Sequence, residues 1–250
     1  MDVSINISAS IVLYKNNIKT LQKTIDSFLK TPLKKKLFLI DNSPTEALKE
    51  CFIAPEIEYI FVGKNIGFGS AHNIVLDIIN SKFHLILNPD VEFNQEVIPT
   101  LIKELEIHKE VSFISPKILY PNKKLQYICR RYPTFFDLIN RRLDLFKKKI
   151  HQQEYRNRDV SKSFYPDFIH GCFMLFKTQE YIDLKGFDER YFLYMEDADM
   201  CKKIDRIGKK KFYFPEVKII HQHQKGSSKN IKLFFYHLSS AIKYFLKWGF

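Results

Sequence analysis

The sequence predicts an α/β protein with a mostly parallel central sheet flanked by helices. Short apolar runs alternate with segments whose apolar residues recur at helical spacing, which is the pattern of a doubly wound parallel sheet. Several of these runs end in clusters of polar and acidic turn residues. Ligands bind at the carboxyl ends of the strands in open α/β sheets, so we expect these turns to meet in one site.

Five strands are predicted in the first half of the chain. Residues 5–14 form the first, and Asn16 or Asn17 can cap the helix whose apolar face begins at Ile18. Pro89 ends the run at 83–87, because proline cannot donate a hydrogen bond to a sheet ladder. The remaining strands are expected at 37–40, 57–62, 83–87 and 111–118, with helices at 70–80 and 95–109.

The pattern changes after residue 119. A helix is predicted at 135–146, and the basic segment of about 141–163 is expected to be a mobile loop because it carries many charges and few apolar residues. Such a loop serves either as a solvated linker or in binding an acceptor. Regular structure resumes at 168–176, a helix runs from Glu196 to Gly208, and a last strand covers 217–220.

The composition favours an anionic partner. The formal net charge is +12 and the pI is near 9.3, which suits a nucleotide, a nucleic acid or an acidic membrane surface. The four cysteines are widely spaced and form no CxxC pair, so we expect reduced thiols. The first residues lack the basic region of a signal peptide, and no apolar run reaches membrane-spanning length. These features predict a cytoplasmic protein.

The stretch Asn88-Pro89-Asp90 places a carboxylate directly after the apolar run at 83–87. A carboxylate at the carboxyl end of a strand can anchor a metal ion, and the metal ion can hold a phosphate. The alternative is a turn aspartate that caps the helix beginning near Gln95. This stretch alone favours the alternative, so the rest of the chain must decide.

Gly67 and Gly69 precede the helix predicted at 70–80. Glycines before a helix N-terminus let the backbone approach a ligand, and the helix terminus favours anions. The third glycine of the dinucleotide-binding fingerprint is absent, so a simple tight turn is the alternative.

Three acids, Glu196, Asp197 and Asp199, fall in the first turn of a predicted helix, where the helix dipole stabilises negative charge. Such a cluster often only caps the helix. Here it follows the aromatic run at 191–194, which would partly desolvate a carboxylate and raise its pKa toward general-base use.

Two histidines, His221 and His223, follow the last strand and can ligate a metal ion or bind a phosphate. Residues 230–250 then form an amphipathic basic helix. Its aromatic and basic residues suit an anionic membrane surface, and packing on the domain is an equal alternative.

Taken in order along nearly the whole chain, these clusters resemble a family 2 glycosyltransferase of the GT-A fold, in the bacterial rhamnosyltransferase-like branch. Each piece is weak alone, but their order and spacing make the resemblance strong. The pieces are residues 11–16, Asp41-Asn42-Ser43, residues 65–69, Asn88-Pro89-Asp90, residues 186–192, residues 196–199, and His221 with Ser227.

The resemblance implies a GT-A domain over residues 1–228, followed by the C-terminal helix at 229–250. Residues 1–118 would be the nucleotide-sugar-binding half, and residues 119–228 the acceptor and catalytic half. Asp41 would accept a hydrogen bond from the base. The other residues implied to bind the nucleotide or substrate are Leu13, Tyr14, Asn65, Gly67, Phe68, Gly69, Asn88, Gly171 and Glu196.

The resemblance also implies the chemistry. Asp90 would hold Mg²⁺ or Mn²⁺ on the donor diphosphate, with His221 or alternatively His223 as a further ligand. Asn88 replaces the first acid of the family's DxD motif, which removes one charge from the metal site. Asp197 would be the catalytic base, taking a proton from the acceptor hydroxyl in a single displacement that inverts the anomeric carbon.

The implied donor is a nucleotide sugar, dTDP-rhamnose or a UDP-hexose. The implied acceptor is a bacterial surface glycan, free or lipid-linked. The protein itself would be cytoplasmic and peripheral on the inner face of the bacterial cytoplasmic membrane. No nucleic-acid partner is expected. Two rival functions remain: a nucleotidyltransferase, which would release pyrophosphate from a nucleoside triphosphate, and a basic module that binds nucleic acid or membranes without catalysis.

Overall fold

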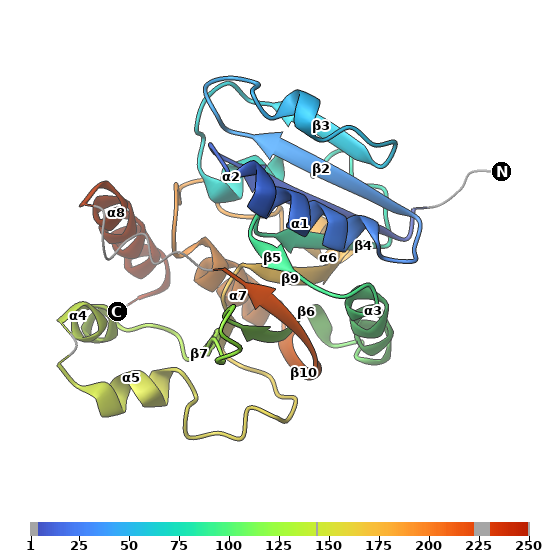
Figure 1. The fold of residues 1–250 in the computed structure, drawn as a ribbon. Coiled ribbons are helices and arrows are strands. Elements are labelled where there is room, and N and C mark those ends of the chain that lie inside the picture. The colour runs from blue at the N-terminus through green and yellow to red at the C-terminus, as the bar shows by residue number, and fades with distance from the viewer. Residues whose placement is uncertain (1–4, 144, 223–230, 250) are drawn as a thin grey trace.

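The computed structural model describes residues 5–143, 145–222 and 231–249, which form a curled eight-stranded sheet with helices packed against it (Figure 1). The strand order in the sheet is β3-β2-β1-β4-β9-β6-β10-β5. The strands of this sheet are β1 (Ile7–Leu13), β2 (Lys35–Asp41), β3 (Ile57–Phe61), β4 (Phe83–Leu87), β5 (Val91–Glu92), β6 (Val111–Leu119), β9 (Phe173–Lys177) and β10 (Lys210–His221).

A second, two-stranded sheet joins β7 (Cys129–Arg130) to β8 (Phe168–Ile169). The described helices are α1 (Ile18–Leu29), α2 (Phe68–Asn73), α3 (Val97–Ile107), α4 (Phe135–Leu143), α5 (Lys147–Gln153), α6 (Thr178–Asp183), α7 (Glu196–Arg206), α8 (Ile231–Trp248) and the 3₁₀ turn η1 (Lys49–Cys51).

The predicted fold class is confirmed. β1, β2, β3 and β4 are parallel, and β6 and β10 are parallel to each other. β9 runs antiparallel between β4 and β6, and β5 runs antiparallel to β10, so the sheet is mixed. Leu13 of β1 pairs with Asp41 of β2, so these two strands reach the same sheet edge at their carboxyl ends.

Local sequence signals explain the first elements. The Asn17 side chain accepts a hydrogen bond from the Thr20 N–H at 3.1 Å and caps α1, as predicted. Every residue of β4 is buried, which is why its apolar run is continuous rather than alternating. The strand stops before Pro89, and Val91 begins the short strand β5.

Two predicted boundaries were wrong. α2 begins at Phe68 and ends at Asn73, because the Asn73 side chain donates to the Phe187 carbonyl and accepts from the Phe187 N–H, both at 2.8 Å. β10 begins seven residues earlier than expected, at Lys210 rather than 217, with a register shift between Phe214 and Lys218. Pro215 interrupts the hydrogen-bond ladder between these residues. The strand begins with the charged residues Lys210 and Lys211, so its start shows no apolar pattern in the sequence.

The segment predicted to be a loop within 141–163 contains the helix α5. Charge pairing orders it rather than apolar burial. Glu154 is buried at the end of α5 and forms ion pairs with Arg141 and Arg156, which lie before and after it in the chain. Sequence composition indicated the high charge but not that one carboxylate would gather these side chains.

The C-terminal segment forms α8, which docks on the domain along one side. Ala241, Tyr244 and Phe245 are buried, and Lys247 forms ion pairs with Asp188 at 2.8 Å and with Asp199 at 2.6 Å. A second apolar stripe on α8 stays exposed. It consists of Ile231, Phe235, Leu238, Ile242 and Leu246. Within the described ranges, no helix has both the length and the apolar character needed to cross a membrane.

Candidate active site

Asp90 and His221 face each other at the edge of the sheet. The Asp90 Oδ1 and His221 Nε2 atoms are 3.3 Å apart, and β5 places them together because His221 pairs with Val91 in the ladder. The Gln126 Oε1 lies 3.0 Å from His221 Nδ1, so an N–H on Nδ1 has a partner and Nε2 is directed at Asp90. Burial opposes protonation of His221, but the Cys172 sulfur and the Asp90 carboxylate favour it, and the pKa of His221 is raised to about 10.

Asp197 is the second acid of α7 and is held by three groups. Its Oδ2 accepts from the Gly171 N–H at 3.2 Å and lies 3.2 Å from the His170 Nδ1, while its Oδ1 accepts from the Ala198 N–H at 2.8 Å. Burial opposes ionisation, but the bonds from His170, Ala198 and Gly171 outweigh it and hold the pKa of Asp197 below its ordinary value. Asp197 is therefore an anion at neutral pH.

Glu196 has the opposite character. It is buried, and its Oε2 has no hydrogen-bond partner among the described residues. Burial and the charges of Asp197 and Asp199 raise the pKa of Glu196 well above its ordinary value. Adjacent carboxyl groups with pKa values pushed in opposite directions are an arrangement found where one acts as an acid and the other as a base.

The turn between β8 and β9 joins these two features. Gly171 donates to Asp197, and the next residue, Cys172, accepts a hydrogen bond from the Asn88 N–H at 3.0 Å. A Cβ atom at position 171 would lie 3.3 Å from the Asp197 Cβ, so the turn leaves little room for a larger residue. The turn thus sets Asn88, Asp90 and His221 on one side and Asp197 on the other.

The turn containing Gly67 and Gly69 packs against the loop before α7. The Phe68 N–H donates to the Phe192 carbonyl at 3.0 Å, and a Cβ atom on Gly69 would lie 2.8 Å from the Phe187 Cβ. The two glycines therefore admit another part of the chain, where the sequence predicted close approach of a ligand. A Cβ atom on Gly69 would also lie 3.8 Å from the Glu196 Cβ.

The residues predicted to face the nucleoside differ in exposure. Tyr14 is half exposed, whereas Leu13 and Asp41 are fully buried. The Asp41 Oδ1 accepts from the Ser43 N–H at 2.8 Å, and its Oδ2 accepts from the Tyr59 hydroxyl. A direct bond from Asp41 to a base therefore needs the covering residues to move. Asn65 closes the glycine turn by accepting from the Gly67 N–H at 3.1 Å.

Asp199 belongs to the C-terminal docking rather than to the acid pair. Its Oδ1 accepts from the Trp248 indole N–H at 2.7 Å and the Tyr191 hydroxyl at 3.2 Å, besides its ion pair with Lys247.

The backbone just before α7 is strained, because Tyr194 and Met195 both have positive φ angles, 70° and 68°.

Sequence reasoning missed His170, Cys172 and Gln126, which contact the acids and His221 directly. A sequence signal existed for the first two, since His170-Gly171-Cys172 interrupts a strand-forming run. His223, the alternative metal ligand, lies outside the described residues. In the described ranges, no group of three or more His, Cys, Asp or Glu side chains is arranged to hold a metal ion, and Asp90 and His221 contact each other as a pair.

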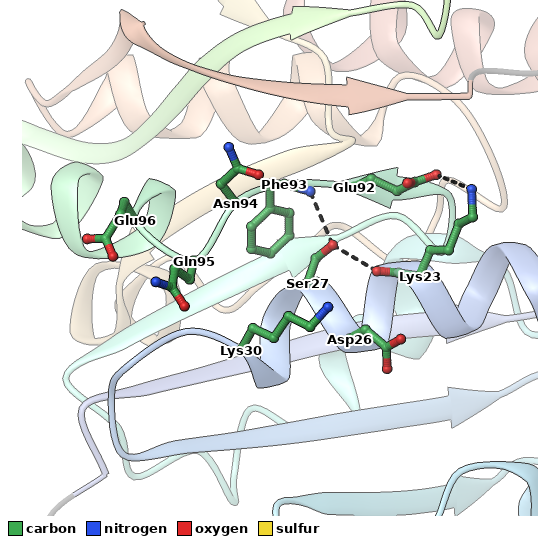
Figure 2. A pocket seen from close by; sticks show the side chains of 9 residues that line it. All are labelled: Lys23, Asp26, Ser27, Lys30, Glu92, Phe93, Asn94, Gln95 and Glu96. Carbon is green, nitrogen blue, oxygen red and sulfur yellow. Dashed lines mark hydrogen bonds and ion pairs between the residues drawn. The ribbon is translucent and has the colours of Figure 1, made fainter.

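A separate surface cavity of about 550 Å³ lies between α1 and the connection from β5 to α3 (Figure 2). Lys23 and Glu92 form an ion pair at 3.3 Å on its wall, and Ser27 accepts from the Phe93 N–H at 3.2 Å. None of the predicted site residues lines this cavity, so its size does not make it the candidate active site. The candidate active site is instead formed by the acids and histidines described above.

A family model of glycosyl transferase family 2 matches residues 10–179 of this chain. This match spans more than half of the sequence and includes the sheet edge, Asp90 and the turn at Gly171. The chain belongs to glycosyl transferase family 2. The predicted family and enzyme class are thereby confirmed, and the rival classes are set aside.

This glycosyltransferase is similar to two curated rhamnosyltransferases. Rhamnosyltransferase WbbL of Escherichia coli (strain K12) is 29% identical over 221 residues, covering 84% of this chain and 81% of the relative. N-acetylglucosaminyl-diphospho-decaprenol L-rhamnosyltransferase of Mycobacterium tuberculosis (strain ATCC 25618 / H37Rv) is 23% identical, covering 82% and 73%.

Solved structures share the GT-A fold of this glycosyltransferase. GalNAc-T7 with UDP, GalNAc and Mn²⁺ superposes with a TM-score of 0.66 at 16% identity, covering 87% of this chain and 43% of that one. The mannosyltransferase PcManGT of Pyrobaculum calidifontis, solved with GDP-Man and Mn²⁺, gives 0.63 at 15% identity, covering 90% and 59%. The chain thus spans less than two thirds of either structure.

Proposed function

We propose that this glycosyltransferase moves a sugar from a nucleoside-diphosphate sugar to a hydroxyl of a lipid-linked bacterial surface glycan, with inversion. dTDP-rhamnose is the first candidate donor and a UDP-hexose the second. The observation that supports the proposal is the turn at Gly171 and Cys172: Gly171 donates to the ionised Asp197, and Cys172 accepts from Asn88, two residues before Asp90. The two rhamnosyltransferase relatives support the choice of donor.

In this proposal the donor lies along the sheet edge. Tyr14 offers an exposed ring to the nucleoside, Leu13 ends the strand beneath it, and Asp41 and Asn65 shape the adjoining loops. The sugar then lies toward Gly171 and Glu196. Gly67, Phe68 and Gly69 support this wall through their contacts with Phe187 and Phe192.

The residues at the sheet edge fit a divalent cation on the donor diphosphate. His221 directs Nε2 at Asp90 while Nδ1 lies beside Gln126, which is how metal-binding histidines are commonly oriented, and a cation bound there would displace the Nε2 proton that Asp90 favours in its absence. Mg²⁺ is often held by one or two protein ligands together with substrate phosphates, so a two-ligand pair is sufficient. A bound Mg²⁺ or Mn²⁺ would neutralise charge on the leaving diphosphate.

Asp197 is the proposed base. Its ionised carboxylate accepts the proton from the acceptor hydroxyl while that oxygen attacks the anomeric carbon from the face opposite the diphosphate. One displacement inverts the anomeric configuration. Glu196, kept protonated by burial and by its acidic neighbours, can donate a hydrogen bond to a sugar hydroxyl beside it.

The proposal includes peripheral contact with the inner face of the bacterial cytoplasmic membrane. The exposed stripe of α8 gives an apolar surface, and the chain after Glu216 has six lysines and no acidic residue. Apolar residues flanked by lysines match the interface of an anionic bilayer, where the acyl region takes the former and the headgroups take the latter.

A thermal-unfolding panel of nucleotide sugars, each with and without Mn²⁺, tests the donor. We expect dTDP-rhamnose with Mn²⁺ to stabilise the protein most, by about 2.7 kcal/mol at a concentration 100 times its Kd. Release of dTDP in the presence of a lipid-linked glycan then tests transfer. Stabilisation by nucleoside triphosphates but by no nucleotide sugar would contradict the proposal.

A further inference from the structure

Three arginines surround one buried carboxylate in the acceptor half. Glu154 Oε1 lies 2.7 Å from Arg141 and 3.7 Å from Arg130, and its Oε2 lies 2.6 Å from Arg156. Burial opposes ionisation of Glu154, but the arginines hold its pKa below its ordinary value. Within the described ranges, Glu154 is the carboxylate that forms ion pairs with these three guanidinium groups, and the Asp197 carboxylate also acts on Arg130 electrostatically. The cluster therefore holds more positive than negative charge.

The guanidinium groups are held in place but are not saturated. Arg141 also donates to the Gln153 side chain, and Arg156 stacks over the Tyr127 ring at 4.5 Å. The Nε of Arg130 is buried and has no hydrogen-bond partner in the described part of the chain. Yet the three side chains remain 21%, 28% and 38% exposed for Arg130, Arg141 and Arg156, so their outer edges are accessible.

The cluster lies next to the proposed base. Arg130 belongs to β7, which pairs with β8, and His170 follows β8 directly and contacts Asp197. The His170 N–H also donates to the Ile128 carbonyl at 3.1 Å, two residues before Arg130. A group bound at the arginines would therefore lie close to the hydroxyl that Asp197 deprotonates.

A purely structural cluster would balance its charges, because unpaired buried cations are costly. Excess arginines with accessible edges are instead the arrangement that binds phosphate, since each planar guanidinium can donate two parallel hydrogen bonds to phosphate oxygens. An excess of positive charge also suits a diphosphate diester, which carries two negative charges.

We propose that Arg130, Arg141 and Arg156 bind the diphosphate of the acceptor. The inference rests on the proposed function and names the acceptor class that the site takes: a glycan whose first sugar is joined to its lipid through a diphosphate. In such an acceptor the phosphates lie within one sugar of the reacting hydroxyl, and the cluster has the same relation to Asp197.

Binding of inorganic pyrophosphate to the full chain tests the site without any transfer reaction. It is measured with saturating dTDP present, so that the donor site is filled. We expect Arg141→Gln and Arg156→Gln each to weaken pyrophosphate binding about tenfold, the usual scale for one lost charge-assisted contact. The control is Arg158→Gln, which removes an arginine that stacks on Phe164 outside the cluster. Equal pyrophosphate affinity in the cluster and control variants would overturn the proposal.

Glu154→Gln separates ligand binding from a structural role. This change removes the carboxylate that occupies the arginines, so we expect tighter pyrophosphate binding even though charge repulsion lowers the unfolding temperature. If the arginine variants lost pyrophosphate binding only because the fold was disturbed, Glu154→Gln, which disturbs the same cluster, would weaken pyrophosphate binding as well. The unfolding temperature of each variant is measured in parallel, and Arg141→Lys, which keeps the charge, replaces any Arg141→Gln protein that fails to fold.

Transfer kinetics connect the site to the acceptor. We expect Arg156→Gln to raise KM about tenfold for a synthetic N-acetylglucosaminyl diphosphate alkyl ester, and to leave KM unchanged for the neutral alkyl glycoside and for the donor. An equal rise for both acceptors would overturn the assignment to the acceptor. No transfer to either acceptor, with pyrophosphate binding changed as expected, would contradict the proposed function and leave the phosphate site supported.

Discussion

Asp197 owes its proposed role to neighbours that the sequence does not place beside it. Two backbone N–H groups and His170 keep it ionised, while burial and the Asp197 charge raise the pKa of the adjoining Glu196. The sequence predicted the acid cluster and its position at a helix start. It could not predict which acid is ionised, because His170 and Gly171 reach Asp197 from a different part of the sheet.

The first prediction concerns the base itself. Asp197→Asn removes the proton acceptor but keeps the shape of the side chain, so transfer should fall by about 10²- to 10⁴-fold. Nucleotide-sugar binding, measured by titration calorimetry, should stay within a factor of about two or three, since no binding charge is proposed there. Asp77→Asn, at an exposed carboxylate, is the control. Unchanged transfer in the Asp197 variant would rule it out as the base.

A second residue-scale prediction tests why position 67 is glycine. Gly67 has φ = +98°, and a Cβ atom there would lie 2.5 Å from the Phe192 carbonyl oxygen. Gly67→Ala should therefore reduce the free energy of unfolding by about 3 kcal/mol, measured by urea denaturation. Gly208 shares the positive φ angle but has no atom within 4 Å of its Cβ position, so Gly208→Ala should cost about 1 kcal/mol. Equal costs would show that backbone strain, not the contact with Phe192, selects the glycine.

At the scale of elements, β1, β4 and α2 are joined by a buried polar network. Ser8 lies 2.7 Å from His84 Nδ1, Ser10 lies 3.0 Å from His84 Nε2, and Ser10 also lies 2.7 Å from His72 Nδ1. Burial lowers the pKa of His72, and it lowers the pKa of His84 to about 3. Both histidines therefore stay neutral in the folded protein at ordinary pH, and the network fixes α2 on the sheet.

This network predicts a pH-dependent stability. The unfolded chain protonates His84 below about pH 6.5, but the folded protein does not until about pH 3. Between these values the unfolded state binds more protons, so the free energy of unfolding decreases as the pH is lowered. His84 alone should make the free energy of unfolding about 2 kcal/mol lower at pH 5 than at pH 8. His84→Gln should remove that part of the pH dependence in urea denaturation, whereas His151→Gln, at an exposed histidine, should keep it. A His84→Gln protein that kept the wild-type slope of stability against pH would contradict the assignment.

Elements were predictable where local signals decide them. Apolar periodicity and capping residues placed α1, β4 and α7 well, because burial and helix ends leave marks in the sequence. α5 and the early start of β10 were missed, because ion pairs with Glu154 and pairing with β6 hold charged segments in regular structure. The β6 partner of β10 is distant in sequence, and ion pairing around Glu154 follows no apolar periodicity, so no local pattern indicates either element.

For the whole molecule, many of the exposed apolar residues lie on or beside the helices α4, α5 and α8. Figure 1 shows α4, α5 and α8 at one end of the molecule, and Phe135 of α4 packs edge-to-face on Phe245 of α8. Besides the stripe of α8, this end exposes Phe135, Phe136, Ile139, Leu145 and Phe146. The proposed diphosphate site lies between this end and Asp197. A lipid-linked acceptor standing in a membrane at this end would present its diphosphate first to the arginines and its sugar to the base.

This arrangement predicts that the α8 stripe carries membrane binding. Phe235→Glu combined with Leu246→Glu should lower binding to vesicles containing phosphatidylglycerol by more than tenfold, because each apolar side chain withdrawn from water contributes about 1.5 to 3 kcal/mol. Ile53→Glu combined with Ile107→Glu makes the same charge change at exposed positions elsewhere and should leave binding to vesicles within about twofold. Binding that survives the α8 change, or that is equally strong for uncharged vesicles, would contradict the role of the stripe and its lysines. Loss in the α8 variant alone would place the acceptor half, with its arginines and Asp197, next to the lipid from which the acceptor comes.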